Sequence, residues 1–300
     1  MTIQCSETEY RNFGRCVCLE SGKIRLMATL DFGPRIIFFG IRGNRNILFE
    51  DVNRDFCELN KGFGTWYAYG GHRLWTSPEA MPETYYPDNN RVSYEESGGV
   101  LTLTAKPTPF GKQFSMQIRF TETGAVKVRN SILNVSEEPA IFAPWSVTGL
   151  AAGGLEFVPL SRRQTGFLPN RTMALWSYSD INDPRFTLKD SYITLRHDPD
   201  AAKPFKAGFN VNDGFMVYAA GNQVFRKRFA VYGDGVYPDF GCNYETYTNR
   251  HFLECELLGE LRAYAPGEEA VIEETWEITE TTQTQEEVVS ALIAEHAGKP

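Results

Sequence analysis

The chain has 300 residues and a formal net charge of −8 at pH 7. This acidic balance argues against a broad nucleic-acid interface, which needs an excess of basic side chains. No run approaches the ~20 apolar residues of a membrane-spanning helix, and the N-terminal "MTIQCSETEYRNFGR" lacks the apolar stretch of a signal peptide. We therefore expect a cytoplasmic protein with neither a nucleic-acid nor a membrane partner.

The six cysteines form no CxxC pair, and no cluster of histidines lies near them. A structural zinc site needs four such ligands close together, so we expect reduced cysteines, no metal and no cofactor. The sequence also lacks the short motifs of serine hydrolases, P-loop NTPases, Rossmann dehydrogenases and zinc proteases. It does not indicate an oligomeric state.

The predicted elements, taken in chain order, are mostly short strands. Apolar and polar residues alternate over 23–30, 101–103 and 114–121, and the alternation resumes after the turn "TETG", which predicts an antiparallel hairpin. A late strand is predicted over 272–278. Helical spacing is confined to the tail "QEEVVSALIAEHAGK". Frequent glycines and prolines between short strands favour a sandwich over βαβ units, so we predict one all-β domain over residues 1–300, made of large antiparallel sheets with a short C-terminal helix.

The segment "WYAYGGHRLWTSPE" concentrates scarce side chains. A neutral imidazole such as that of His72 titrates near physiological pH and suits proton transfer, and Arg73 can form paired hydrogen bonds to hydroxyls or a carboxylate. On a strand, His72 and Leu74 share one face, and Arg73 and Trp75 share the other. The segment is therefore either one wall of a ligand cleft or the place of a buried histidine and a structural ion pair.

Two loop-like segments combine acidic and aromatic residues. "SPEAMPETYYPDNN" contains Glu79 and Asp88 among prolines, which hold polar groups in place at low entropic cost. "LPNRTMALWSYSDINDPR" contains Trp176 and Tyr178 among acids and arginines that could pair with one another. In the first segment, carboxylates that accept hydroxyl hydrogen bonds, together with aromatic rings, are typical of a sugar-binding loop, and an ordinary surface loop is the alternative. In the second segment, pairing of the acids with the arginines is the alternative to a functional site.

Two later segments place functional side chains on strand faces. In "APWSVTGLAAGG", Trp145 belongs either to a cleft or to the core. In "YETYTNRHFLECE", Glu245 and Tyr247 would share one face, and Glu245 is the candidate general base. Glu254 and Glu256 also share a face, which is either part of the same site or a solvated strand edge.

These segments together resemble a bacterial family with a galactose mutarotase-like fold. The resemblance rests on "GGHRLWTSPE", "YYPDN", "APWSVTGLAAGG", "LPNR", "DPR", "YPDFGCNYETYTNRHFLECELLG" and "APGEE…ETWEI", and it covers about residues 31–278. It implies a β-supersandwich with a cleft for a small-molecule sugar, as in the aldose 1-epimerase group. "YETYTN" looks like the segment that carries the base of that group, which assigns this role to Glu245. "GPRIIFFG", which includes Arg35, looks like their early strand.

The epimerases carry a catalytic histidine in mid-chain, whereas the corresponding "FAPWSVTGL" has none. His72 is therefore the candidate acid, and the first hypothesis is anomer interconversion by acid–base ring opening. The second is sugar binding without catalysis, and the third is lyase or glycosidase chemistry, with Arg73 neutralising a uronate. The expected substrate contacts are Arg35, Arg73, Trp75, Glu79, Asp88, Trp145 and Tyr247.

Overall fold

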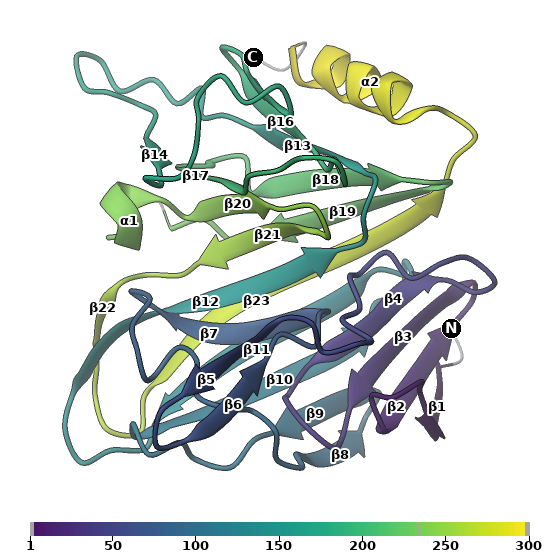
Figure 1. The fold of residues 1–300 in the computed structure, drawn as a ribbon, viewed down its shortest axis with the longest axis vertical. Helices are drawn as coiled ribbons and strands as arrows, with labels where there is room; N and C mark the ends of the chain where they lie inside the picture. The colour runs from purple at the N-terminus through teal and green to yellow at the C-terminus, as the bar shows by residue number, and fades with distance from the viewer. Residues whose placement is uncertain (1–2, 233–234, 298–300) are drawn as a thin grey trace.

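The computed structural model of the protein describes residues 3–232 and 235–297 and contains two large antiparallel sheets (Figure 1). The first sheet has the order β1 (Ile3–Glu9), β2 (Arg15–Ser21), β3 (Ile24–Thr29), β4 (Ile36–Ile41), β7 (His72–Ser77), β12 (Ala140–Leu150), β21 (Leu253–Leu258), β20 (Tyr244–Thr248), β17 (Phe205–Phe209) and β14 (Met173–Leu175), with β22 (Arg262–Tyr264) beside β12.

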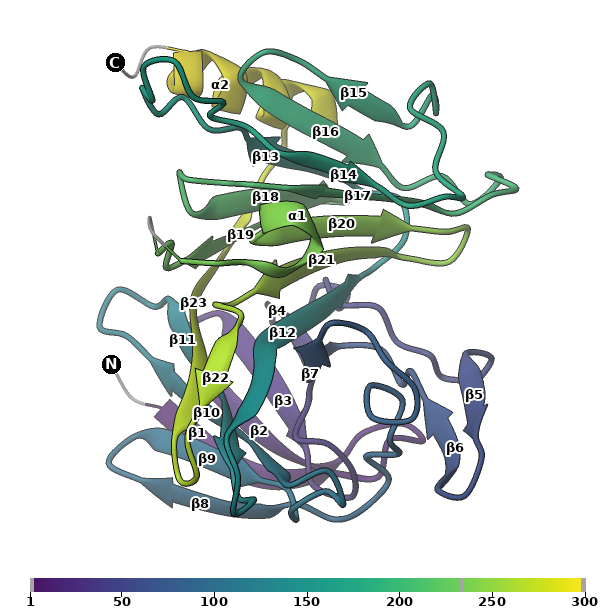
Figure 2. The ribbon, with the colours of Figure 1, turned by 90° about the vertical axis from the view of Figure 1, so that its left-hand side faces the viewer.

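The second sheet has the order β15 (Phe186–Leu188), β16 (Tyr192–Arg196), β13 (Leu155–Pro159), β18 (Phe215–Ala220), β19 (Gln223–Phe229), β23 (Glu269–Glu280), β11 (Val126–Asn134), β10 (Lys112–Phe120), β9 (Val100–Thr104) and β8 (Ser93–Ser97). A separate hairpin of β5 (Cys57–Asn60) and β6 (Gly64–Tyr67) projects at the side (Figure 2). The all-β sandwich predicted from the alternation is confirmed.

The helices are few and short. α2 (Gln285–Ala297) follows the predicted tail, except that residues 298 and 299 lie outside the described part of the chain, and it packs on β13 and β18. α1 (Pro238–Gly241) is closer to a turn, because Asp239 and Phe240 both have positive φ. Within the described residues, no helix has the length and apolar character needed to cross a membrane.

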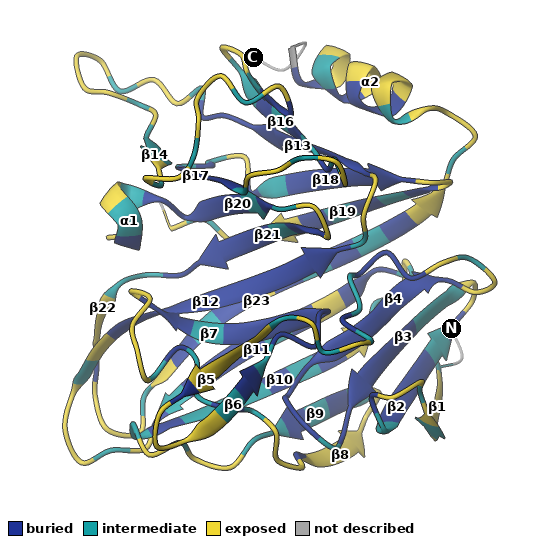
Figure 3. Cartoon of the chain, viewed as in Figure 1, coloured by how far each residue is buried: buried dark blue, intermediate teal, exposed yellow. Residues whose placement is uncertain are grey.

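The hydrophobic core lies between the two sheets and follows from the two-residue period of the strands. Leu26 and Ala28 of β3, for example, share one buried cluster with Met116 and Ile118 of β10. Figure 3 shows the central strands of both sheets as buried, whereas β8 at the edge of the second sheet is exposed. The hairpin predicted around "TETG" is β10–β11, with Phe120 opposite Val126.

A buried ion pair lies within this core. Lys227 Nζ of β19 is 3.0 Å from Glu274 Oε2 of β23, and neither side chain is exposed. Glu274 also accepts hydrogen bonds from Ser146 Oγ of the first sheet (2.6 Å) and Trp276 Nε1 (2.7 Å). Burial alone would raise the pKa of Glu274, but Lys227 and these donors outweigh it and lower the pKa to about 2. The carboxylate is therefore ionised and bonded to both sheets.

His72 belongs to the same polar cluster. Its Nδ1 lies 2.7 Å from Thr148 Oγ1, and its Nε2 lies 3.1 Å from Asn130 Oδ1 and 3.8 Å from Glu274 Oε1. The side chain is completely buried, and this desolvation lowers its pKa to about 4 despite the nearby carboxylate. The imidazole is therefore neutral at pH 7.

Replacement of Glu274 tests the contribution of the buried ion pair. Glu274→Gln leaves the Lys227 ammonium buried without a counter-charge, so we expect the free energy of unfolding in urea to fall by about 3–5 kcal/mol. The matched control is Glu277→Gln on the same strand, whose pair with Arg228 is exposed and should change stability by less than about 0.5 kcal/mol. Equal effects of the two substitutions would contradict this role of the ion pair.

The buried His72 also predicts acid sensitivity. Its folded pKa of about 4 lies below its unfolded value of 6.5, so its contribution to stability is present above pH 6.5 and is lost as the pH falls towards 4. We expect the wild type to lose roughly 3 kcal/mol more than His72→Gln over this interval. Urea unfolding at several pH values measures the difference, and His251→Gln, at an exposed position, should behave as the wild type does.

Candidate functional site

A cleft of about 600 Å³ lies on the face of the first sheet that points away from the second sheet. Its floor comes from β7, β12, β17, β20 and β21, whose register places Trp75 opposite Trp145 and Tyr247 opposite Glu254. The hairpin β5–β6 and the segment after β14 complete the walls. Strand alternation therefore collects side chains from five strands on one surface.

Tryptophan is concentrated in this cleft. Four of the five tryptophans of the chain line it, namely Trp66, Trp75, Trp145 and Trp176, and the fifth, Trp276, is buried in the core. Tyrosines from three separate segments also line the cleft. Pockets rich in aromatic rings with few, fixed polar groups are typical of small-molecule sites.

Each basic side chain of the cleft lies between two of these tryptophans. The Arg73 guanidinium is 4.1 Å from the ring centroid of Trp75 and 5.6 Å from that of Trp66. Lys206 Nζ is 4.9 Å from the Trp145 centroid and 4.6 Å from the Trp176 centroid. Cation–π attraction of this kind fixes the basic group and orients the rings.

Each of the two basic side chains also pairs with a carboxylate. Arg73 Nη2 donates to Glu254 Oε1 at 3.2 Å. Lys206 Nζ lies 2.8 Å from Glu245 Oε2 and donates to Glu256 Oε2 at 2.9 Å. Both basic groups thus have an acidic partner before any ligand binds.

The two acids beside Lys206 differ in their surroundings. Glu256 accepts a second hydrogen bond from Trp145 Nε1 at 2.8 Å. Burial raises the pKa of Glu245 to about 9, although Lys206 opposes the shift, so Glu245 is protonated at pH 7. Burial alone would lower the pKa of Lys206, but the neighbouring Glu256 outweighs it and raises the pKa well above its usual value.

The structure brings most of the expected site residues to this cleft. Arg73, Trp75, Glu79, Trp145 and Tyr247 all line it. The carboxyl group of Glu245 lies on the same face of the sheet, directly opposite Glu256 in the register. It is only 1% exposed and reaches the cleft through its contact with Lys206.

Three of the expected site residues do not line the cleft. His72 lies on the opposite face of β7, between the sheets, and cannot reach a ligand in the cleft. Arg35 is buried; its Nη1 donates to the backbone oxygens of Ala68 (2.8 Å) and Gly70 (2.7 Å), and its Nη2 donates to Asp88 (2.9 Å). Arg35 and Asp88 therefore fix the segments around the site, and neither lines the cleft.

Sequence reasoning missed Lys206 altogether and left Glu254 and Glu256 as a possible solvated edge. A signal was present in "PFKAGFN" and "FLECELLG", where charged residues alternate with apolar ones. The apolar partners Phe205, Ala207, Leu253 and Cys255 are buried in the core. A charged side chain on such a strand must face a second surface, and here that surface is the cleft.

Within 3–232 and 235–297, no group of acidic, cysteine and histidine side chains is suited to a metal ion.

No protein-family model matches the chain, and no curated protein sequence matches it. Among solved structures, a TPR-domain containing protein from Parabacteroides distasonis aligns over 91% of this chain at 12% identity with a TM-score of 0.62, and the chain spans 48% of that protein's length.

Galactose mutarotase-like proteins from Lactobacillus casei and Clostridium acetobutylicum align over 88% and 93% of this chain, and over 100% and 99% of their own, at 9% and 10% identity with TM-scores of 0.53 and 0.52. Identities this low carry information on the fold alone. The chain has the galactose mutarotase-like fold.

Proposed function

We propose that the cleft binds a carbohydrate. The proposal rests on one observation: four tryptophans and several fixed hydrogen-bonding groups lie together on one open face of the first sheet. Indole rings can stack on the apolar faces of a sugar ring, and the paired carboxylates and basic groups can bond to its hydroxyls. The fold shared with galactose mutarotase-like proteins supports the same substrate class by analogy.

The charge of the cleft favours a sugar without an acidic group. Two basic side chains line it, and both already have acidic partners. The acidic residues that line it are five, namely Asp55, Glu58, Glu79, Glu254 and Glu256. A carboxylate or phosphate on the ligand would be repelled here unless an existing ion pair opened. This balance also weighs against uronate lyase chemistry, which requires a basic group free to neutralise the substrate.

Trp176 offers the clearest test of binding, because its side chain is half-buried and lies at the wall of the cleft. Titration calorimetry with galactose and glucose should show binding to the wild type and about tenfold or weaker binding to Trp176→Ala, since an aromatic stacking partner is lost. Galacturonate and galactose 6-phosphate should bind more weakly than the neutral sugars.

The matched control for this test is Tyr94→Ala, an aromatic truncation on β8 of the second sheet, which should leave sugar affinity unchanged. If the wild type binds no neutral sugar, the carbohydrate proposal fails.

A second function, interconversion of sugar anomers, is supported by the neighbouring acids Glu245 and Glu256. Mutarotation requires a base at the anomeric hydroxyl and an acid at the ring oxygen, and both oxygens are bonded to the same carbon. With His72 in the core, the protonated Glu245 is the proposed acid, and Glu256, which lines the cleft, is the proposed base. This reverses the role of base that the sequence resemblance implies for Glu245.

Exchange spectroscopy by NMR on galactose tests this assignment. Glu245→Gln should slow anomer exchange by about 10²-fold or more while sugar affinity is kept, because general acid–base groups contribute about 10²–10⁴-fold. The wild-type rate should fall as the pH rises through about 9, where Glu245 loses its proton. Glu58→Gln, at an exposed position on the cleft rim, is the control. Binding without exchange in the wild type would favour a non-catalytic sugar-binding protein.

A further inference from the structure

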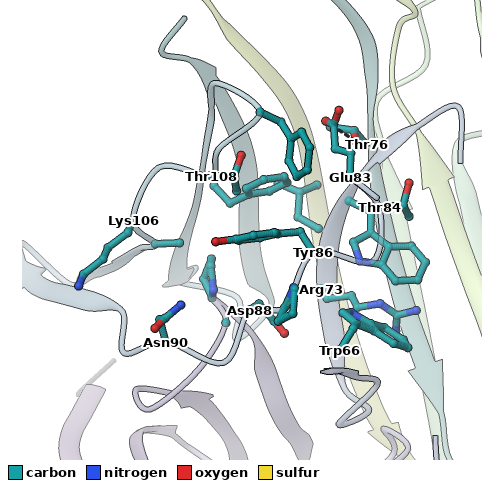
Figure 4. A pocket seen from close by; sticks show the side chains of 18 of the residues that line it. Trp66, Arg73, Thr76, Glu83, Thr84, Tyr86, Asp88, Asn90, Lys106 and Thr108 are labelled. Carbon is teal, nitrogen blue, oxygen red and sulfur yellow. Dashed lines mark hydrogen bonds between the residues drawn. The ribbon is translucent and has the colours of Figure 1, made fainter. Parts of the chain in front are cut away.

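A second and smaller cavity of about 180 Å³ lies beside the cleft (Figure 4). Its walls come from β7, from the segment 83–90, from the segment 105–110 that follows β9, and from Trp66. Figure 4 shows Tyr86 near the centre of the cavity, with Arg73 on one side and Thr108 on the other. A cavity of about 150 Å³ holds a benzene molecule in an engineered protein, so this one has room for a substituted single ring.

The cavity lies along an edge of β7. Four consecutive residues of this strand, Arg73 to Thr76, line it. Successive side chains of a strand point to opposite faces, so a cavity that contacts four in a row must face the edge where backbone N–H and C=O groups point. β7 pairs with β12 along its full length, whereas its pairing with β4 is limited to His72 and Ile36. From Arg73 onwards, the second edge of β7 therefore faces the cavity and not another strand.

The side chains around this edge are preorganised. Asp88 is held by Arg35, and Glu83 accepts hydrogen bonds from Lys112 Nζ at 2.6 Å and Thr76 Oγ1 at 3.1 Å. These bonds tie the segment 83–90 to the strands on either side. Because the walls of the cavity are already fixed, little conformational entropy is lost when a ligand binds.

The walls combine flat rings with buried polar atoms. Trp66, Tyr86 and Phe110 contribute aromatic surface. Arg73 Nε, Asp88 Oδ1 and Thr108 Oγ1 belong to lining residues, are shielded from bulk water and have no hydrogen-bond partner in the described chain. Buried polar groups are nearly always hydrogen-bonded in proteins, so this cavity suits a ligand that brings both a donor and an acceptor.

We propose that this cavity is a second binding site, which takes a small planar amide that pairs with the free edge of β7. An amide presents one N–H and one C=O in a plane, which is the complement of a strand edge. Its flat body fits against the aromatic walls. The size of the cavity limits the ligand to about one ring, such as a cyclic amide, and excludes a longer peptide strand. The proposal does not depend on sugar binding in the cleft.

The test uses the full chain with 2-piperidone as the probe, followed by ligand-observed NMR titration. We expect binding with a dissociation constant on the order of 1 mM, as befits so small a ligand. N-methyl-2-piperidone keeps the ring and the carbonyl but lacks the N–H donor, so it should bind about tenfold more weakly or not at all. Equal binding of the two compounds, or no binding of either, would overturn the proposal.

Two variants locate the site. Thr108→Phe places a ring in the cavity and should abolish 2-piperidone binding, whereas Thr123→Phe, in the exposed turn between β10 and β11, should leave it unchanged. Thermal unfolding checks that both variants fold. If one variant does not fold, the comparison of 2-piperidone with N-methyl-2-piperidone on the wild type still tests the proposal. The Trp176→Ala variant, which alters the cleft, should still bind 2-piperidone. If this variant no longer bound 2-piperidone, the amide would lie in the cleft and the proposal of a second site would be refuted.

Discussion

The buried ion pair between Lys227 and Glu274 is the constraint on which the arrangement of this site depends. A charged pair in the core is tolerable only when further hydrogen bonds satisfy it, and Glu274 obtains them from both sheets. Ser146 and Thr148 point towards this cluster from β12. The same strand turns Trp145 and Val147 to the opposite face, which is the floor of the cleft. A slip of one residue in β12 would exchange the two sets of side chains.

The polar core and the cleft are thus two sides of the same strands. On β7, His72 faces the core cluster and its neighbour Arg73 faces the tryptophans. On each side the basic groups are paired with carboxylates from other strands: Lys227 with Glu274 in the core, and Arg73 and Lys206 with Glu254 and Glu256 at the cleft. The second cavity arises where this strand loses its neighbour β4.

Much of the fold and part of the candidate site could be predicted from the local alternation of apolar and polar residues in the sequence. The alternation placed the strands, separated His72 from Arg73 and grouped Glu245 with Tyr247, because the two-residue period is a local property. Which face of β7 turns inward could not be predicted, since both faces carry polar residues. That choice is made by Lys227 and Glu274, which lie about 150 to 200 residues further along the chain and whose partners no local spacing reveals. Lys206 was missed for the same reason, because its two carboxylates come from other strands.

The ion pair between Lys206 and Glu256 also determines the reactivity of the lysine. A free lysine amine next to a bound sugar is a hazard, because the open-chain form of an aldose has an aldehyde that condenses with amines to an imine. Only the deprotonated amine attacks a carbonyl, and the neighbouring Glu256 raises the pKa of Lys206, so that its ammonium form persists far above neutral pH. The side chain can therefore lie at the floor of the cleft without becoming a nucleophile, and the proposed sugar ligand would not form a covalent adduct with it.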